Sequence, residues 1–229
     1  SGGELRGSYL AEKGMTAARL GYRMARGHES PVRLTFNNVR TLDELARRVT
    51  ANLAVSPEAF LAATDSLLSA KGFKKAEYPA AFLCDTYEVY ATTSAEKLVR
   101  RLVKARDTFW NPDRIAKARE LGLDPVGVTT IASIVAEETS KADERPKVAR
   151  LYLNRLSRGM KLQADPTVKF AIGDFSLRRI GGSMLNIDSP YNTYRVKGLP
   201  PGPIRIVDPQ LIDDVLNAPA HNYIYMCAR

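Results

Sequence analysis

Helix start signals recur along this chain of 229 residues and limit how much of it can enter a sheet. Prolines at positions 57, 125 and 209 each follow a Ser or Asp, the order expected where a capping side chain precedes the first helical residue. The residues that start the predicted helices are Thr16, Thr41, Ser56, Ser94, Asp124, Asp143 and Asp208. We therefore predict an α+β fold in which helices dominate and the sheets are small.

The predicted strands are short and scattered. Each is a brief run of apolar or β-branched residues near turn formers, and together they cover residues 7–10, 31–36, 82–91, 161–170 and 223–226. Residues 173–203 are rich in Gly, Pro, Ser and Asn, so we expect a loop there. No apolar run approaches the roughly 18 residues that a membrane-spanning helix needs.

The chain carries a net charge of +9, from 34 Lys and Arg against 25 Asp and Glu. Such an excess of positive charge favours an anionic partner, such as nucleic acid, a membrane surface or an acidic polymer. A basic surface that is simply solvated would account for the same composition. The basic residues are spread along the chain, and no nucleic-acid-binding motif is present. Nucleic acid is therefore not a predicted partner.

Residues that commonly bind metals are few. The chain has two cysteines, Cys84 and Cys227, and two histidines, His28 and His221, and none of the four lies at metal-ligand spacing from another. Two ordinary thiols are favoured over a Cys84–Cys227 disulfide. We predict no metal site and no cofactor.

A predicted helix over residues 129–139 brings one carboxylate into apolar surroundings. Ile131, Ile134 and Val135 lie seven, four and three residues before Glu138, so all four share one helical face, while Glu137 is rotated away. Apolar neighbours favour the neutral form of a carboxyl group by desolvation. A carboxyl group that is protonated near neutral pH is suited to general-acid chemistry.

Two other interpretations of this region stay open. Glu138 can be a structural acid paired with Arg145 or Arg155. A glycosidase with two catalytic carboxylates would need a second one roughly 5–9.5 Å away, and Asp165 or Glu137 would be the candidate.

Three segments downstream combine aromatic rings, amides and turn formers. They cover residues 154–156 with 159–168, residues 189–194 and residues 198–203. This mixture suits sugars, because rings stack on the sugar face while amides and carboxylates bind the hydroxyls. Simpler interpretations remain for each segment. Asp165 can cap a turn, Tyr191 and Tyr194 can be core residues, and residues 198–203 can form a rigid loop.

The chain resembles the YceG-like (MltG) family of endolytic murein transglycosylases over nearly its whole length. Several motifs in the expected order carry this resemblance. They are residues 39–41 (Val-Arg-Thr), 85–87 (Asp-Thr-Tyr), 132–139 (Ala-Ser-Ile-Val-Ala-Glu-Glu-Thr), 144–148 (Glu-Arg-Pro-Lys-Val), 154–156 (Asn-Arg-Leu), 162–168 (Leu-Gln-Ala-Asp-Pro-Thr-Val), 191–194 (Tyr-Asn-Thr-Tyr) and 198–203 (Gly-Leu-Pro-Pro-Gly-Pro). This chain differs from the family at two positions. Family members often have Glu where this chain has Ala136, and usually have Pro where it has Cys84.

The resemblance implies a domain organisation and a location. Residues 1–31 would be the remnant of a LysM-like subdomain and residues 32–229 a YceG-like catalytic domain without the family's C-terminal tail. Family members are single-pass proteins of the inner (cytoplasmic) membrane, with the catalytic domain on the periplasmic side. Their N-terminal membrane helix lies outside this sequence. Peptidoglycan glycan strands are the implied substrate, and peptidoglycan synthases are the implied protein partners.

The resemblance also implies a reaction, which is cleavage of the MurNAc-β-1,4-GlcNAc bond with formation of a 1,6-anhydro-MurNAc end. The family's catalytic glutamate directly precedes Thr in its signature, and that position is Glu138. Residue type and motif membership add six predicted substrate contacts: Gln163, Asp165, Asn154, Tyr191, Asn192 and Tyr194. The alternatives are a hydrolytic muramidase and a non-catalytic peptidoglycan-binding scaffold.

Overall fold

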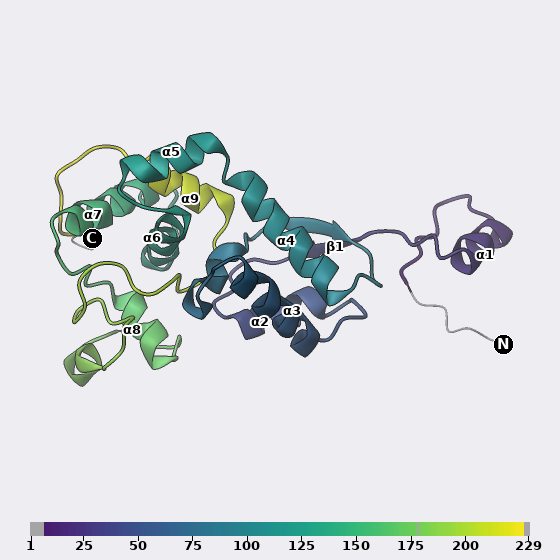
Figure 1. The fold of residues 1–229 in the computed structure, drawn as a ribbon, viewed down its shortest axis with the longest axis horizontal. Coiled ribbons are helices and arrows are strands. Elements are labelled where there is room, and N and C mark those ends of the chain that lie inside the picture. The colour runs from purple at the N-terminus through teal and green to yellow at the C-terminus, as the bar shows by residue number, and fades with distance from the viewer. Residues whose placement is uncertain (1–6, 178, 227–229) are drawn as a thin grey trace.

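The computed structural model describes residues 7–177 and 179–226 (Figure 1). Its α-helices are α1 (Ala17–Ala25), α2 (Leu42–Thr50), α3 (Pro57–Ala70), α4 (Ala95–Phe109), α5 (Pro112–Glu120), α6 (Pro125–Glu138), α7 (Arg145–Ser157), α8 (Asp165–Ile172) and α9 (Pro209–Leu216). Two 3-10 helices are η1 (Lys75–Ala81) and η2 (Gly182–Asn186). Six of the seven predicted start residues accept, through their side chains, a hydrogen bond from the backbone N–H three residues later, so these helix starts are confirmed. The seventh, Asp143, is wrong: α7 begins after Glu144, and no side chain caps it.

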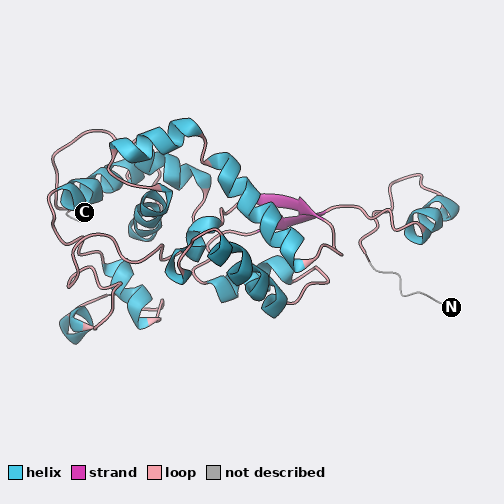
Figure 2. Cartoon of the chain, in the orientation of Figure 1, coloured by secondary structure: helices cyan, strands magenta, loops and turns pink. Residues whose placement is uncertain are grey.

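The sheet is small, as predicted. Strand β1 (Val32–Thr35) pairs antiparallel with β2 (Thr86–Val89), with Val32 opposite Val89 and Thr35 opposite Thr86 (Figure 2). These strands fall within the predicted ranges 31–36 and 82–91. With helices in most other places, the α+β class is confirmed.

Three other predicted strands are wrong. Residues 7–10 and 223–226 have no regular secondary structure. In the range 161–170, helix α8 begins at Asp165 because Pro166 occupies its first turn, where the missing N–H costs no hydrogen bond. The carbonyl groups of Tyr223 and Ile224 accept hydrogen bonds from side chains of α7.

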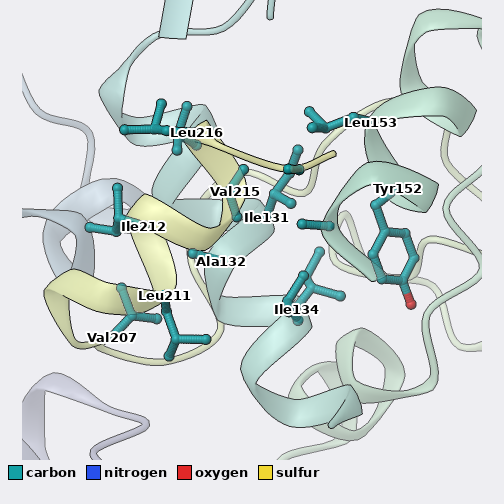
Figure 3. Close-up of a cluster of buried hydrophobic side chains, with 14 of the residues drawn as sticks. Ile131, Ala132, Ile134, Tyr152, Leu153, Val207, Leu211, Ile212, Val215 and Leu216 are labelled. Atoms are coloured by element: carbon teal, nitrogen blue, oxygen red, sulfur yellow. The ribbon is translucent and has the colours of Figure 1, made fainter. Parts of the chain in front are cut away.

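The buried apolar residues form two clusters. One is built from β1, β2, η1 and helices α2, α3 and α4, with Phe36, Phe60 and Phe82 among its largest side chains. The other is built mainly from α6, α7 and α9 (Figure 3). Helix α6 runs through this second cluster and is buried on every side from Gly127 to Val135.

Close backbone approaches join the two clusters. The Cys84 N–H, in the first cluster, donates to the carbonyl of Val207, in the second, at 2.9 Å. The neighbouring residue Ile206 belongs to the first cluster and forms an isolated antiparallel bridge with Val39. Gly202 lies so close to η1 that a Cβ atom there would be 1.8 Å from the backbone oxygen of Ala76. Of the two glycines in the 198–203 segment, Gly202 is therefore required by this close backbone contact with η1.

Helix α1 lies apart from the body at the N-terminal end of the molecule and has no buried residue (Figure 1). Its assignment to a LysM-like remnant, residues 1–31, stays a prediction. In the described part of the chain, none of the helices has both the length and the apolar character needed to span a membrane. Cys84 is a buried thiol, whereas Cys227 lies outside the described residues.

Candidate active site

Glu138 is the last residue of α6, at the point where the helix emerges from its apolar surroundings. Ile131, Ile134 and Val135, which share its face, are fully buried, and Glu138 itself is partly buried. Thr139 has extended backbone dihedrals and ends the helix. The carboxylate therefore lies at the negative end of the helix dipole, which further disfavours its charged form.

The Glu138 carboxylate is bound by a tyrosine from the neighbouring helix. The hydroxyl of Tyr152, on α7, donates to Oε1 of Glu138 at 2.7 Å. The ring of Tyr152 is buried in the cluster around α6, with only 2% of the residue exposed. Figure 3 draws this ring at the margin of the cluster, with the hydroxyl oxygen at its outer end.

The protonation of Glu138 is set by burial and by three nearby side chains. Burial raises the pKa of Glu138 above its ordinary value of 4.5, and this is the largest effect. The hydrogen bond from Tyr152 lowers the pKa, the charge of Asp165 raises it, and the charge of Lys169 lowers it. The balance is upward, so the neutral acid persists to a higher pH than in an ordinary glutamate.

Asp165 and Tyr194, both predicted site residues, are held together. The Tyr194 hydroxyl donates to Oδ1 of Asp165 at 2.6 Å, and burial followed by the Asp165 contact raises the pKa of Tyr194. The loop that carries Tyr194 is attached to the start of α8 through Thr193, whose Oγ1 accepts from the Ala164 N–H at 3.0 Å. This attachment brings Tyr194 and Asp165 into the electrostatic surroundings of Glu138.

Gln163 precedes α8 in an uncommon backbone conformation. Its φ of +53° lies in the left-handed region, and its side chain is exposed. Its Oε1 accepts a hydrogen bond from Nη2 of Arg155, and its N–H donates to the carbonyl of Thr193 at 3.1 Å. These contacts place Gln163 beside the loop that holds Tyr194.

The other three predicted substrate contacts bind parts of the protein. The Asn192 amide nitrogen donates to the carbonyls of Leu185 and Ile187, at 2.9 and 2.8 Å, and Asn192 is fully buried. The Asn154 amide nitrogen donates to backbone carbonyls in residues 221–223. Tyr191 packs on Phe170, with ring centroids 4.7 Å apart. A substrate role for these three residues stays a prediction.

Glu137 faces the half of the molecule that contains β1 and β2. Its carboxylate pairs with Arg40 at 3.1 Å and with Arg205 at 2.8 Å. The Arg205 guanidinium also donates to Oδ1 of Asn38 at 3.0 Å. Glu137 is therefore neutralised between the two clusters and is not a free second carboxylate beside Glu138.

The predicted alternative of an ion-paired Glu138 has no support in the described residues, where no salt bridge includes this carboxylate. The Arg155 guanidinium donates to Oε1 of Gln163. It also donates to the carbonyl of Lys161 at 2.9 Å and to the carbonyl of Ile224 at 2.8 Å. Arg145 donates to the carbonyl of Ser140 at 3.5 Å. Over the same described part of the chain, no three His, Cys, Asp or Glu side chains cluster to hold a metal.

This arrangement has a counterpart among known proteins. Residues 5–229 match the YceG-like family. The chain belongs to this family. A YceG-like protein from Listeria monocytogenes has a similar crystal structure, with a TM-score of 0.75 and 27% identity over 94% of this chain and 76% of that one.

Two relatives in the family are named endolytic murein transglycosylases. The one from Bacillus subtilis is 32% identical over 137 residues, which are 60% of this chain and 38% of the relative. The one from Streptococcus pneumoniae is 32% identical over 148 residues, which are 62% of this chain and 26% of the relative. The matched regions thus span well under half the length of these relatives.

Tyr152 and Lys169 influence Glu138 but were absent from the predicted site. Tyr152 has helical spacing with apolar neighbours, so its sequence position predicts a core residue. The available signal was its hydroxyl, because a buried tyrosine hydroxyl usually needs a hydrogen-bond partner. Lys169 lies one turn after Asp165 on α8, a relationship that becomes visible only once α8 is recognised as a helix.

Proposed function

We propose that this chain is an endolytic lytic transglycosylase that cuts the glycan strands of peptidoglycan, with Glu138 as its general acid and base. The observation that carries the proposal is the carboxyl group of Glu138, whose pKa is raised by burial. The names of the relatives in Bacillus subtilis and Streptococcus pneumoniae support the same reaction.

In the proposed mechanism, protonated Glu138 gives its proton to the glycosidic oxygen as the bond from that oxygen to the anomeric carbon of MurNAc breaks. The resulting carboxylate accepts the proton of the MurNAc C6 hydroxyl, whose oxygen forms the new bond to the anomeric carbon. The product is a 1,6-anhydro-MurNAc end. Glu138 regains its proton, so one carboxyl group suffices because the nucleophile belongs to the substrate.

Asp165, Tyr194 and Gln163 are the substrate contacts that we propose. Asp165 and Tyr194 lie in the electrostatic surroundings of Glu138, and Gln163 presents an exposed amide beside them. An amide, a carboxylate and a phenol are suited to the hydroxyl and acetamido groups of a glycan. We do not propose direct contact for Asn154 or Asn192, whose amide nitrogens bind backbone carbonyls.

A hydrolytic muramidase is the second candidate, and Asp165 is the observation that favours it. Its carboxylate is close enough to influence Glu138 electrostatically and has no salt bridge within the described residues. In that mechanism Asp165 would direct a water molecule or form a covalent intermediate. The two candidates differ in their products, because only the transglycosylase leaves anhydro ends.

The test is digestion of purified glycan strands lacking stem peptides, read by mass spectrometry. We expect anhydro-ended fragments from the wild-type chain and none from a Glu138→Gln variant. Reducing ends would replace the proposal with the muramidase. Binding without cleavage would favour a peptidoglycan-binding scaffold.

We also propose that the domain works at the outer face of the cytoplasmic membrane, near the synthases that make new strands. The family resemblance and the net charge of +9, which suits an anionic surface or polymer, support this location. Protease accessibility in spheroplasts tests it, since an external domain is cleaved without lysis. Protection until lysis would contradict it.

A further inference from the structure

Tyr152 contacts one oxygen of Glu138 and leaves the other available. Its hydroxyl lies 2.7 Å from Oε1. Within the described residues, Oε2 of Glu138 has no hydrogen-bond partner. The two oxygens of this carboxyl group therefore lie in different surroundings.

The position of the tyrosine hydroxyl is fixed by packing. Tyr152 belongs to α7, which packs along α6, and its ring is buried in the same cluster as Ile131 and Ile134. A buried ring with 2% exposure has little freedom to move its hydroxyl away from Oε1. The contact is thus built into the pairing of two core helices.

The direction of this hydrogen bond is also fixed. Burial, followed by the charge and hydrogen bond of Glu138, raises the pKa of Tyr152 well above its ordinary value of 10.0. Tyr152 therefore keeps its proton throughout the pH range in which a carboxyl group titrates. A tyrosine that donates to Oε1 leaves Oε2 as the oxygen on which Glu138 carries its own proton.

We propose that Tyr152 is a positioning residue that holds Oε1 of Glu138 and so makes Oε2 the oxygen that exchanges protons with the glycan. This inference rests on the proposed transglycosylase function. In the first step the proton leaves Oε2 for the glycosidic oxygen as the glycosidic bond breaks. In the second step Oε2 takes the proton of the C6 hydroxyl as the anhydro bond forms. Tyr152 keeps its own proton in both steps.

The test uses a Tyr152→Phe variant, which removes one oxygen and keeps the ring. Loss of the hydrogen bond removes a contact that stabilises the carboxylate, so we expect the pKa of Glu138 to rise. We expect kcat on glycan strands to fall roughly 10-fold or more while KM changes little, because the substrate contacts remain. The high-pH limb of the pH–rate profile, along which Glu138 loses its proton, should move to higher pH.

Tyr87→Phe is the matched control. Tyr87 belongs to the cluster built from β1, β2 and α2 to α4, is similarly buried at 3% exposure, and its hydroxyl donates to the carbonyl of Leu83 at 2.7 Å. This variant loses a buried hydroxyl contact of the same length without touching Glu138. We expect it to keep the wild-type pH–rate profile, so a shift confined to Tyr152→Phe reports on positioning and not on general destabilisation.

A second measurement needs no variant of Tyr152. In a pH titration of wild-type protein labelled with carbon-13, the chemical shift of Tyr152 Cζ should change with the same midpoint as that of Glu138 Cδ. Comparison with the Glu138→Gln variant identifies the Glu138 resonance. A Tyr152 signal that ignores this titration would overturn the inference. If the wild-type protein cleaves glycan strands and Tyr152→Phe has the same pH–rate profile, the positioning role of Tyr152 is overturned. The proposed function would remain intact. Absence of wild-type cleavage would instead overturn the proposed function and this role with it.

Discussion

Glu137 and Glu138 are adjacent on α6, yet their carboxylates have opposite surroundings. Glu137 pairs with Arg40 and Arg205, whereas Glu138 is bound by the neutral hydroxyl of Tyr152. A turn of about 100° per residue separates the two side chains around the helix. One carboxylate therefore joins the two halves of the molecule while its neighbour keeps a raised pKa.

Glu137→Gln should destabilise the fold. It would leave the guanidinium groups of Arg40 and Arg205, whose side chains are 28% and 15% exposed, without their anion. We expect a loss of about 2 kcal/mol in the free energy of unfolding, less than for a fully enclosed pair. Urea unfolding measures it. The control is Glu144→Gln, which breaks the more exposed pair with Lys141; an equal loss in both variants would contradict the role of Glu137.

Glu138→Gln should change how stability depends on pH. Because the folded-state pKa of Glu138 is raised above 4.5, its protonation contributes stability that is fully present below pH 4.5 and is lost as the pH rises through the raised pKa. A glutamine has no such loss. Compared with wild type, we expect the variant to gain relative stability as the pH rises from 4.5 through the raised pKa of Glu138, measured by urea unfolding. A constant difference across this range would contradict the prediction.

Asp165→Asn and Lys169→Gln should shift the pKa of Glu138 in opposite directions. The charge of Asp165 raises this pKa and the charge of Lys169 lowers it. Neutralising Asp165 should therefore lower the pKa, and neutralising Lys169 should raise it. Carbon-13 titration of the Glu138 carboxyl group measures both changes. Shifts of the same sign would show that these charges do not act directly on Glu138.

Gly202→Ala should be more damaging than Gly198→Ala in the same loop. A Cβ atom at Gly202 would collide with the backbone oxygen of Ala76, and backbone cannot rotate away as a side chain can. We expect a loss of about 3 kcal/mol in the free energy of unfolding. Gly198 has a φ of +84° but open space around it, so alanine there should cost about 1 kcal/mol. Equal losses would mean that η1 moves to accommodate the new atom.

The helix starts were predictable because capping depends on residues close in sequence. Asp124 followed by Pro125 gives the start of α6 from local chemistry alone. The failed strand over residues 161–170 shows the limit of this approach. A short alternating apolar pattern fits either element, and only the proline in the first turn of α8 decides between them.

The site was predictable only in part. Helical spacing placed Glu138 beside Ile134 and Val135, although α6 turned out to be buried on every side and not along one stripe. The contact with Tyr152 depends on how α6 and α7 pack, which no local pattern encodes. Motif membership brought Asn192 into the predicted site, yet its amide stabilises the 185–192 loop, because motifs do not distinguish loop-shaping amides from exposed ones.

The side chains that influence Glu138 come from one continuous part of the chain. Tyr152, Asp165 and Lys169 all lie between the start of α6 and the end of α8. The half that contains β1 and β2 meets α6 through Arg40 and Glu137. A change in the half that contains β1 and β2 would therefore reach Glu138 only indirectly, through the backbone contacts and the Arg40–Glu137 pair that fix the position of α6.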